Sequence, residues 1–141
     1  MRKASNILFI IALLVTAVSL TFLIASCVWS FMISAPGYKE EIIKGLQSGA
    51  ITPLDPALSY EENASNIQSI FLIIALVSLF LFIASMAKLV ALSIAKKRHL
   101  TYMYIISMTL GVVTGDALSI MAPIFGLVAN RQEEEEITIN Y

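Results

Sequence analysis

The sequence has few charged residues and almost none of the side chains on which enzyme chemistry commonly depends. Lys, Arg, Asp and Glu make up 13% of the 141 residues, whereas hydrophobic residues make up 58%; soluble domains have about a quarter charged residues. The chain has one Cys and one His, which excludes an internal disulfide and the usual His and Cys metal sets. This scarcity of charge indicates a membrane protein.

Motifs for catalysis and for nucleic-acid binding are also missing. The six glycines are scattered and form neither a GxGxxG sequence nor a P-loop, and no Ser is paired with His and Asp in a readable motif. The net charge is −1, and no basic patch alternates with aromatic residues. We therefore expect a protein that is not an enzyme, uses no cofactor or metal ion and binds no nucleic acid. His99 is expected to be a surface residue of a basic loop.

Apolar residues are gathered into three blocks. The block 5–34 has no charged residue, the block 66–95 has only Lys88, and the block 100–130 has only Asp116. A bilayer core of about 30 Å is crossed by about 20 apolar residues in a helix. The first two blocks therefore predict transmembrane helices, and the Lys88 ammonium is expected to reach the nearer interface. The predicted fold is an all-α integral membrane protein, a small helical bundle that forms one membrane domain.

The start of the chain resembles a lipoprotein signal as far as Cys27. Arg2 and Lys3 precede a long apolar run, and small residues precede the cysteine. However, the run stays apolar to Ile33, which is too long for the short hydrophobic region of a cleaved signal. We therefore expect a spanning helix that retains Met1, with Cys27 as a small packing residue.

The polar segments between the blocks predict a topology. The loop 35–65 is expected outside the cytoplasm, with a short amphipathic helix over 38–47. Ser59 and Glu62 match a capping box that begins the second long helix. Positive side chains favour the cytoplasmic side of a membrane, and they occur in two clusters: Arg2 and Lys3 before the first block, and Lys96, Lys97 and Arg98 in the loop 96–99. The amino terminus is therefore predicted to be cytoplasmic.

The block 100–130 permits two interpretations. One kinked span, giving three helices, would place Asp116 near the bilayer centre, where a carboxylate costs about 2.5–3.5 kcal/mol; there it would bind a proton or cation, or pair with Lys88. A short helical hairpin, giving four helices, would turn at 114–116, bring Asp116 toward water and place both termini in the cytoplasm. Each helix would be only about 21 Å long, which is short for a span. The Gly115–Asp116 pair is typical of a turn.

Small residues recur at every fourth position in all three blocks. This spacing lets helices approach closely, either within one chain or between membrane proteins. For Gly111 and Gly115 we expect a close helix contact, where a Cβ would separate the backbones. The candidate packing residues are Ala17, Thr21 and Ala25 in the first block, Ala87, Ala91 and Ala95 in the second, and Ser107, Gly111, Gly115 and Ser119 in the third.

The last third of the chain resembles a family of membrane proteins. The stretch LSIAKKRHLTYMYIISMTLGVVTGDALSIMAPIFGLVANR contains a basic loop, an apolar segment, a Gly-polar turn and a last apolar segment. In this order of features it is similar to small multi-span membrane proteins of unknown function from low-GC Gram-positive bacteria. The resemblance implies four helices with both termini in the cytoplasm, and it favours the hairpin. Pro123 stands where those proteins often carry Gly.

Three functions agree with these features. The first is a non-catalytic accessory or interaction subunit of a membrane or cell-envelope complex, which we favour because of the small-residue spacing and the lack of site chemistry. The second is a small oligomeric transporter or pore that uses Asp116. The third is a holin-like protein, suggested by the chain's size and the acidic tail 131–141. We expect a multi-pass protein of the cell membrane that contacts lipid and either other membrane proteins or its own copies.

Overall fold

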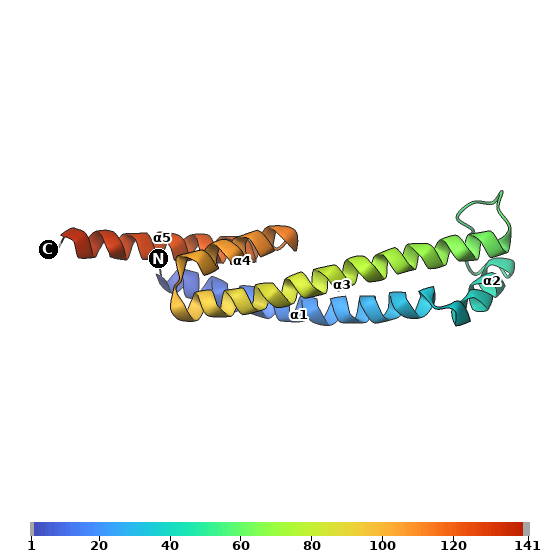
Figure 1. The fold of residues 1–141 in the computed structure, drawn as a ribbon, viewed down its shortest axis with the longest axis horizontal. Coiled ribbons are helices and arrows are strands. Elements are labelled where there is room, and N and C mark those ends of the chain that lie inside the picture. Colours follow the sequence, from blue (N-terminus) through green and yellow to red (C-terminus); the bar gives the residue numbers. More distant parts are fainter. Residues whose placement is uncertain (1, 140–141) are drawn as a thin grey trace. The chain divides into compact units, whose positions relative to one another are not determined.

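The computed structural model of the chain describes residues 2–139 for the backbone and 3–132 for the side chains, and the regular elements in this range are all helices. Two helices, α1 and α3, are long and apolar enough to cross a membrane. The described residues form no β-strand, so the all-α class is confirmed. The elements are α1 (Arg2–Ser34), the 3-10 helix η1 (Pro36–Tyr38), α2 (Lys39–Gln47), α3 (Tyr60–Arg98), α4 (Thr101–Val113) and α5 (Ala117–Ile139) (Figure 1).

The ends of the long helices follow from local sequence. Ala35 is extended, with φ −68° and ψ 143°, because the ring of Pro36 disfavours a helical residue before it. The predicted capping box at the start of α3 is confirmed: the Ser59 N–H and hydroxyl donate to Glu62 Oε2 at 3.0 and 2.8 Å, and the Glu62 N–H donates to Ser59 Oγ at 3.2 Å. Helix α1 therefore ends where Pro36 interrupts it, and α3 begins where Ser59 and Glu62 provide hydrogen-bond partners for each other's backbone N–H groups.

The chain divides into two compact units. Unit 1 comprises Met1–Thr21 and Leu81–Tyr141, and unit 2 comprises Phe22–Phe80. The helices α1 and α3 each contribute one part to each unit. Each unit has an apolar core of its own.

The core of unit 1 joins residues of α1, α3, α4 and α5. The Phe9 and Tyr104 rings lie 5.8 Å apart and are tilted by 38°, an arrangement that aromatic pairs favour. Helices α4 and α5 lie side by side and run in opposite directions (Figure 1). The residues buried in this core are Phe9, Ala12, Leu92, Ala95, Tyr104 and Ala122.

The core of unit 2 lies under α2. Ile42, Leu46 and Ala64 are buried there, while the charged residues of α2 remain exposed or half-exposed. This arrangement confirms the predicted amphipathic helix. Gly49 follows α2 with a φ of +75°, a left-handed conformation that glycine adopts without strain at the end of a helix.

Candidate functional site: a buried ion pair at the turn between α4 and α5

The third apolar block is divided into α4 and α5 by the residues 114–116. The Gly115 N–H donates to the Val112 carbonyl at 3.1 Å, and the Asp116 N–H donates to the Gly111 carbonyl at 2.9 Å. These two bonds are the pair that closes a Schellman motif at a helix end. Gly115 has a φ of +65°, which explains why the turn uses glycine. The block is therefore a helical hairpin.

Asp116 uses its two carboxylate oxygens for different partners. Oδ1 accepts hydrogen bonds from the N–H groups of Leu118 at 3.0 Å and Ser119 at 3.3 Å, so it caps the start of α5. Oδ2 accepts a hydrogen bond from the Ser119 hydroxyl at 2.6 Å and one from Lys88 Nζ at 2.9 Å. The same side chain thus begins a helix and holds a cation.

Lys88 reaches the turn from α3. Its Nζ also donates to Thr114 Oγ1 at 2.9 Å, and that hydroxyl donates to the Leu110 carbonyl at 2.8 Å. The side chains of Lys88 and Asp116 are 3% and 14% exposed. The pair is therefore buried. Each partner bonds the opposite charge and one hydroxyl group, Thr114 for Lys88 and Ser119 for Asp116. Such additional hydrogen bonds are the condition under which a buried ion pair is tolerated.

This geometry corrects two expectations. The Lys88 ammonium does not reach for the interface, because it is bonded to Asp116 and Thr114. The Asp116 side chain is turned into the protein, with 14% of it exposed. Pairing with Lys88 was expected only for a single kinked span. The chain instead combines the hairpin with the ion pair.

Gly111 and Gly115 have different roles. A Cβ at Gly111 would lie 3.0 Å from the carbonyl carbon of Ser119 and 3.0 Å from Cγ1 of Ile120, so α4 approaches the backbone of α5 there. At Gly115 nothing lies within 4 Å of the Cβ position. The expected close contact at Gly115 is wrong, since this glycine is needed for its positive φ.

The remaining candidate packing residues form two sets: an inward set that is buried and an outward set that is exposed. The Thr21 hydroxyl donates to the Ala17 carbonyl of its own helix at 3.3 Å. The outward set is confined to α1 and the middle of α3. Ser107, Ser119, Ala91 and Ala95 are buried, whereas Ala17, Thr21, Ala25 and Ala87 are exposed.

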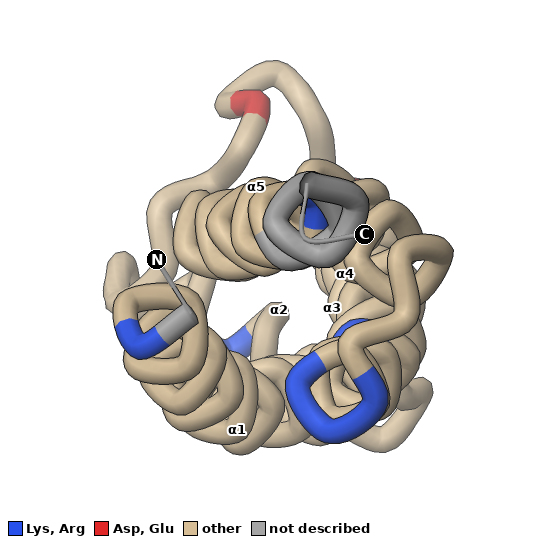
Figure 2. The backbone as a smooth tube through the Cα atoms, turned by 90° about the vertical axis from the view of Figure 1, so that its left-hand side faces the viewer, with Lys and Arg blue, Asp and Glu red and all other residues tan. Residues whose placement is uncertain are grey.

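The two basic clusters lie at one end of unit 1. Figure 2 shows the basic segments at the start of α1 and at the end of α3 on the end that faces the viewer. Lys3, Lys97 and Arg98 are exposed and Lys96 is half-exposed; the side chain of Arg2 lies outside the described residues. All four therefore belong to the same surface of this unit.

A second polar group was not expected from the sequence. His99 is half-buried, with Nδ1 2.9 Å from the Tyr104 hydroxyl and its carbonyl accepting from Asn130 Nδ2 at 2.8 Å. Its φ is +52°, and its N–H donates to the Ala95 carbonyl at 3.0 Å, so it ends α3 in a left-handed conformation. His99 is thus not a free surface residue. No sequence signal distinguishes this role.

No family model, curated protein or solved structure matches the chain significantly. Within the described residues, no group of three or more His, Cys, Asp or Glu is placed to hold a metal ion. The chemistry of the site therefore lies in Lys88, Asp116 and their hydroxyl partners.

Proposed function

We propose that the protein is an integral membrane protein in which α1 and α3 cross the bilayer. In the most apolar window of each helix only 22% of the residues are buried, whereas a core helix of a soluble protein would be mostly buried. Large apolar side chains such as Phe22 and Phe80 are 72% and 61% exposed. Apolar surface on this scale requires a lipid or protein covering.

We further propose that α4 and α5 form a re-entrant hairpin that enters from the basic side. Lys88 lies ten residues before Arg98, which is about 15 Å along a helix, and a bilayer core is about 30 Å thick. Val112, beside the turn, is 67% exposed and is suited to hydrocarbon. A turn at that depth has to satisfy its backbone within the protein, and the Schellman bonds together with the Lys88–Asp116 pair support this.

A thiol-labelling experiment tests the topology. In a Cys27→Ala background, a new cysteine at Asn140 should not react with an impermeant reagent in intact cells, because both ends of the hairpin lie on the cytoplasmic side. A cysteine at Ser48 should react, since the loop before α3 is expected outside. Labelling at position 140 from outside would contradict the hairpin topology and favour a third span.

Within the membrane, we propose that the protein acts through contacts with other membrane proteins, as an accessory or interaction subunit. One observation carries this proposal: Ala17, Thr21 and Ala25 are exposed, although Thr16 and Leu20 on the same helix are buried. Small residues at this spacing permit close helix approach. The described residues of the chain leave this stripe exposed, so a second copy or another membrane protein is the expected partner.

Bulky substitution of the stripe tests this role. Ala17→Leu combined with Ala25→Leu should dissociate the protein from its complex in mild detergent. The dissociation would be measured as a fall in particle mass. Val18→Leu combined with Phe22→Leu is the matched control, because Val18 and Phe22 are also exposed but large already. An unchanged particle mass for the Ala17 and Ala25 variant would count against the interaction role.

The transporter alternative has less support. Both oxygens of Asp116 already accept hydrogen bonds from the chain, and Lys88 neutralises its charge. A carrier of protons or cations would need this carboxylate to release those partners. Ion flux in proteoliposomes that Asp116→Asn abolishes, with the complex left intact, would reverse this preference.

A further inference from the structure

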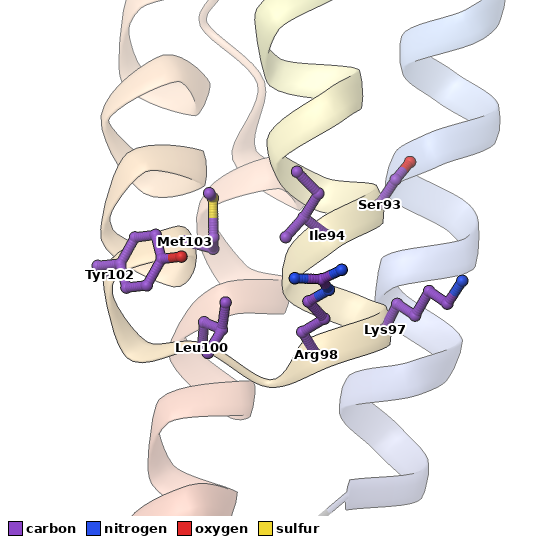
Figure 3. Close-up of a pocket in the computed structure, with 7 residues that line it drawn as sticks. All are labelled: Ser93, Ile94, Lys97, Arg98, Leu100, Tyr102 and Met103. Carbon is purple, nitrogen blue, oxygen red and sulfur yellow. The ribbon is translucent and has the colours of Figure 1, made fainter.

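A groove of about 420 Å³ lies in unit 1 between the end of α3 and the start of α4. Its apolar lining includes Ile94, Leu100 and Met103, and its basic lining is Lys97 and Arg98. Figure 3 shows the Arg98 guanidinium lying next to Ile94, while Met103 and Leu100 line the facing side. A cationic group and an apolar channel are thus side by side.

The two cations have no acidic partner among the described side chains of unit 1. The one carboxylate described there is Asp116, and Lys88 occupies it at 2.9 Å. Lys97 and Arg98 are both exposed, and they belong to the basic end of unit 1 (Figure 2). Figure 3 shows the Arg98 guanidinium at the groove, whereas the Lys97 side chain extends away from Met103 and Leu100. The groove therefore offers the positive charge of Arg98 directly, with that of Lys97 on the neighbouring residue.

We propose that this groove binds an anionic phospholipid, with its phosphate at the Arg98 guanidinium, the neighbouring charge of Lys97 adding attraction, and an acyl chain along Ile94, Leu100 and Met103. This inference rests on the proposed membrane insertion. Arg matches phosphate oxygens in a bidentate fork and Lys adds a point charge. Basic pockets between helices on the cytoplasmic side bind lipid head groups in this way. Tyr102, which is 55% exposed, adds an aromatic ring suited to the interface.

Native mass spectrometry tests the proposal on the purified full chain. The protein is taken from nanodiscs that contain equal amounts of phosphatidylglycerol and phosphatidylcholine, and the lipid adducts are counted. Retention of phosphatidylglycerol should exceed that of phosphatidylcholine. Lys97→Gln combined with Arg98→Gln should reduce that preference about 25-fold, since each basic residue contributes about fivefold near an anionic lipid. Inorganic phosphate at millimolar concentration should not displace the lipid, because it lacks the acyl chain.

Lys39→Gln combined with Lys44→Gln is the matched control, because it removes two charges from α2 in unit 2 and should leave the preference unchanged. Equal retention of both lipids, or an unchanged preference in the Lys97 and Arg98 variant, would overturn the proposal. So would phosphatidylglycerol binding that appears only after Glu133, Glu134, Glu135 and Glu136 are changed to Gln, since the chain's own acidic segment would then occupy the cations. Membrane fractionation of the cells from which each variant is purified separates these outcomes from a failure of membrane insertion itself.

Discussion

Unit 1 and unit 2 each contain a polar connection between helices, and they satisfy it by opposite means. In unit 1 the turn at 114–116 uses two full charges, Lys88 and Asp116, which are 3% and 14% exposed at their side chains. In unit 2 the segment that precedes α3 is held by a neutral amide, Asn63, which is completely buried. The charged Glu62, in the first turn of α3, stays exposed in its capping box.

Asn63 uses both ends of its amide. Its Oδ1 accepts from the Asp55 N–H at 3.0 Å, and its Nδ2 donates to the carbonyls of Asp55 at 2.9 Å and of Leu58 and Ser59 at 3.2 Å each. An amide carries donors and an acceptor together. It therefore organises a loop without any counter-charge.

This difference determines what a single substitution costs. A buried ion pair is at best weakly stabilising, but removal of one partner leaves an uncompensated charge in a poorly polarisable environment. A buried amide leaves only unpaired polar groups when it is removed, and those in a loop can be reached by water. Unit 1 should consequently be more sensitive to loss of one partner, and it should recover when both charges are removed.

The largest effect is expected for Lys88→Met. It leaves the Asp116 carboxylate buried without its cation, so the free energy of unfolding should fall by about 3–5 kcal/mol. The measurement is SDS-titrated unfolding in mild detergent. Adding Asp116→Asn to Lys88→Met should recover most of the loss, because an Asn oxygen still caps α5 and no charge remains. A double variant as unstable as Lys88→Met would show that the pair does more than neutralise charge.

In unit 2, Asn63→Ala should lower the free energy of unfolding by roughly 2–3 kcal/mol, since the Asp55 N–H and the Asp55 and Leu58 carbonyls lose their side-chain partner. Hydrogen exchange should accelerate at the Asp55 N–H, because this group donates its hydrogen bond to Asn63 Oδ1. Ser65→Ala is the control, because the Ser65 hydroxyl bonds only the Glu61 carbonyl of its own helix. A loss in Asn63→Ala as large as that in Lys88→Met would remove the contrast between the units.

Gly111→Leu tests how closely α4 and α5 pack in unit 1. A side chain there meets the α5 backbone at 3.0 Å, so overpacking should cost on the order of 1–3 kcal/mol. The measurement is thermal unfolding in detergent. Val112→Leu, at the neighbouring exposed position, should leave the melting temperature unchanged. Equal melting temperatures for the two variants would mean that α4 and α5 are not in close contact at Gly111.

Much of the fold follows from local sequence rules. The Ser59–Glu62 capping box, the amphipathic helix α2 and the turn at 114–116 each depend on residues within a few positions of one another, and the structure contains all three. Patterns of this kind are readable because their partners are close in the sequence.

The site was only partly predictable. Asp116 was identified from its isolation in an apolar block, but its pairing depends on Lys88, 28 residues away in the chain. The sequence presented water exposure and ion pairing as alternatives tied to different folds. The turn and the ion pair occur together because α3 packs against the hairpin with Lys88 beside Asp116. The roles of Asn63 and His99 depend on backbone groups, which carry no residue-specific signal.

The smallest effect, and the only stabilising one, is expected for Thr16→Val in unit 1. Thr16 is completely buried, and its hydroxyl is the one buried side-chain polar atom without a hydrogen-bond partner among the described residues. By contrast, the exposed Thr21 hydroxyl bonds the carbonyl four residues earlier. Valine keeps the branched shape and removes the unpaired group, so the free energy of unfolding should rise by about 1 kcal/mol. Thr21→Val is the matched control and should change it little. A loss of stability in Thr16→Val, measured by the same SDS titration, would mean that the hydroxyl is bonded in the membrane and that unit 1 satisfies its polar groups as completely as unit 2.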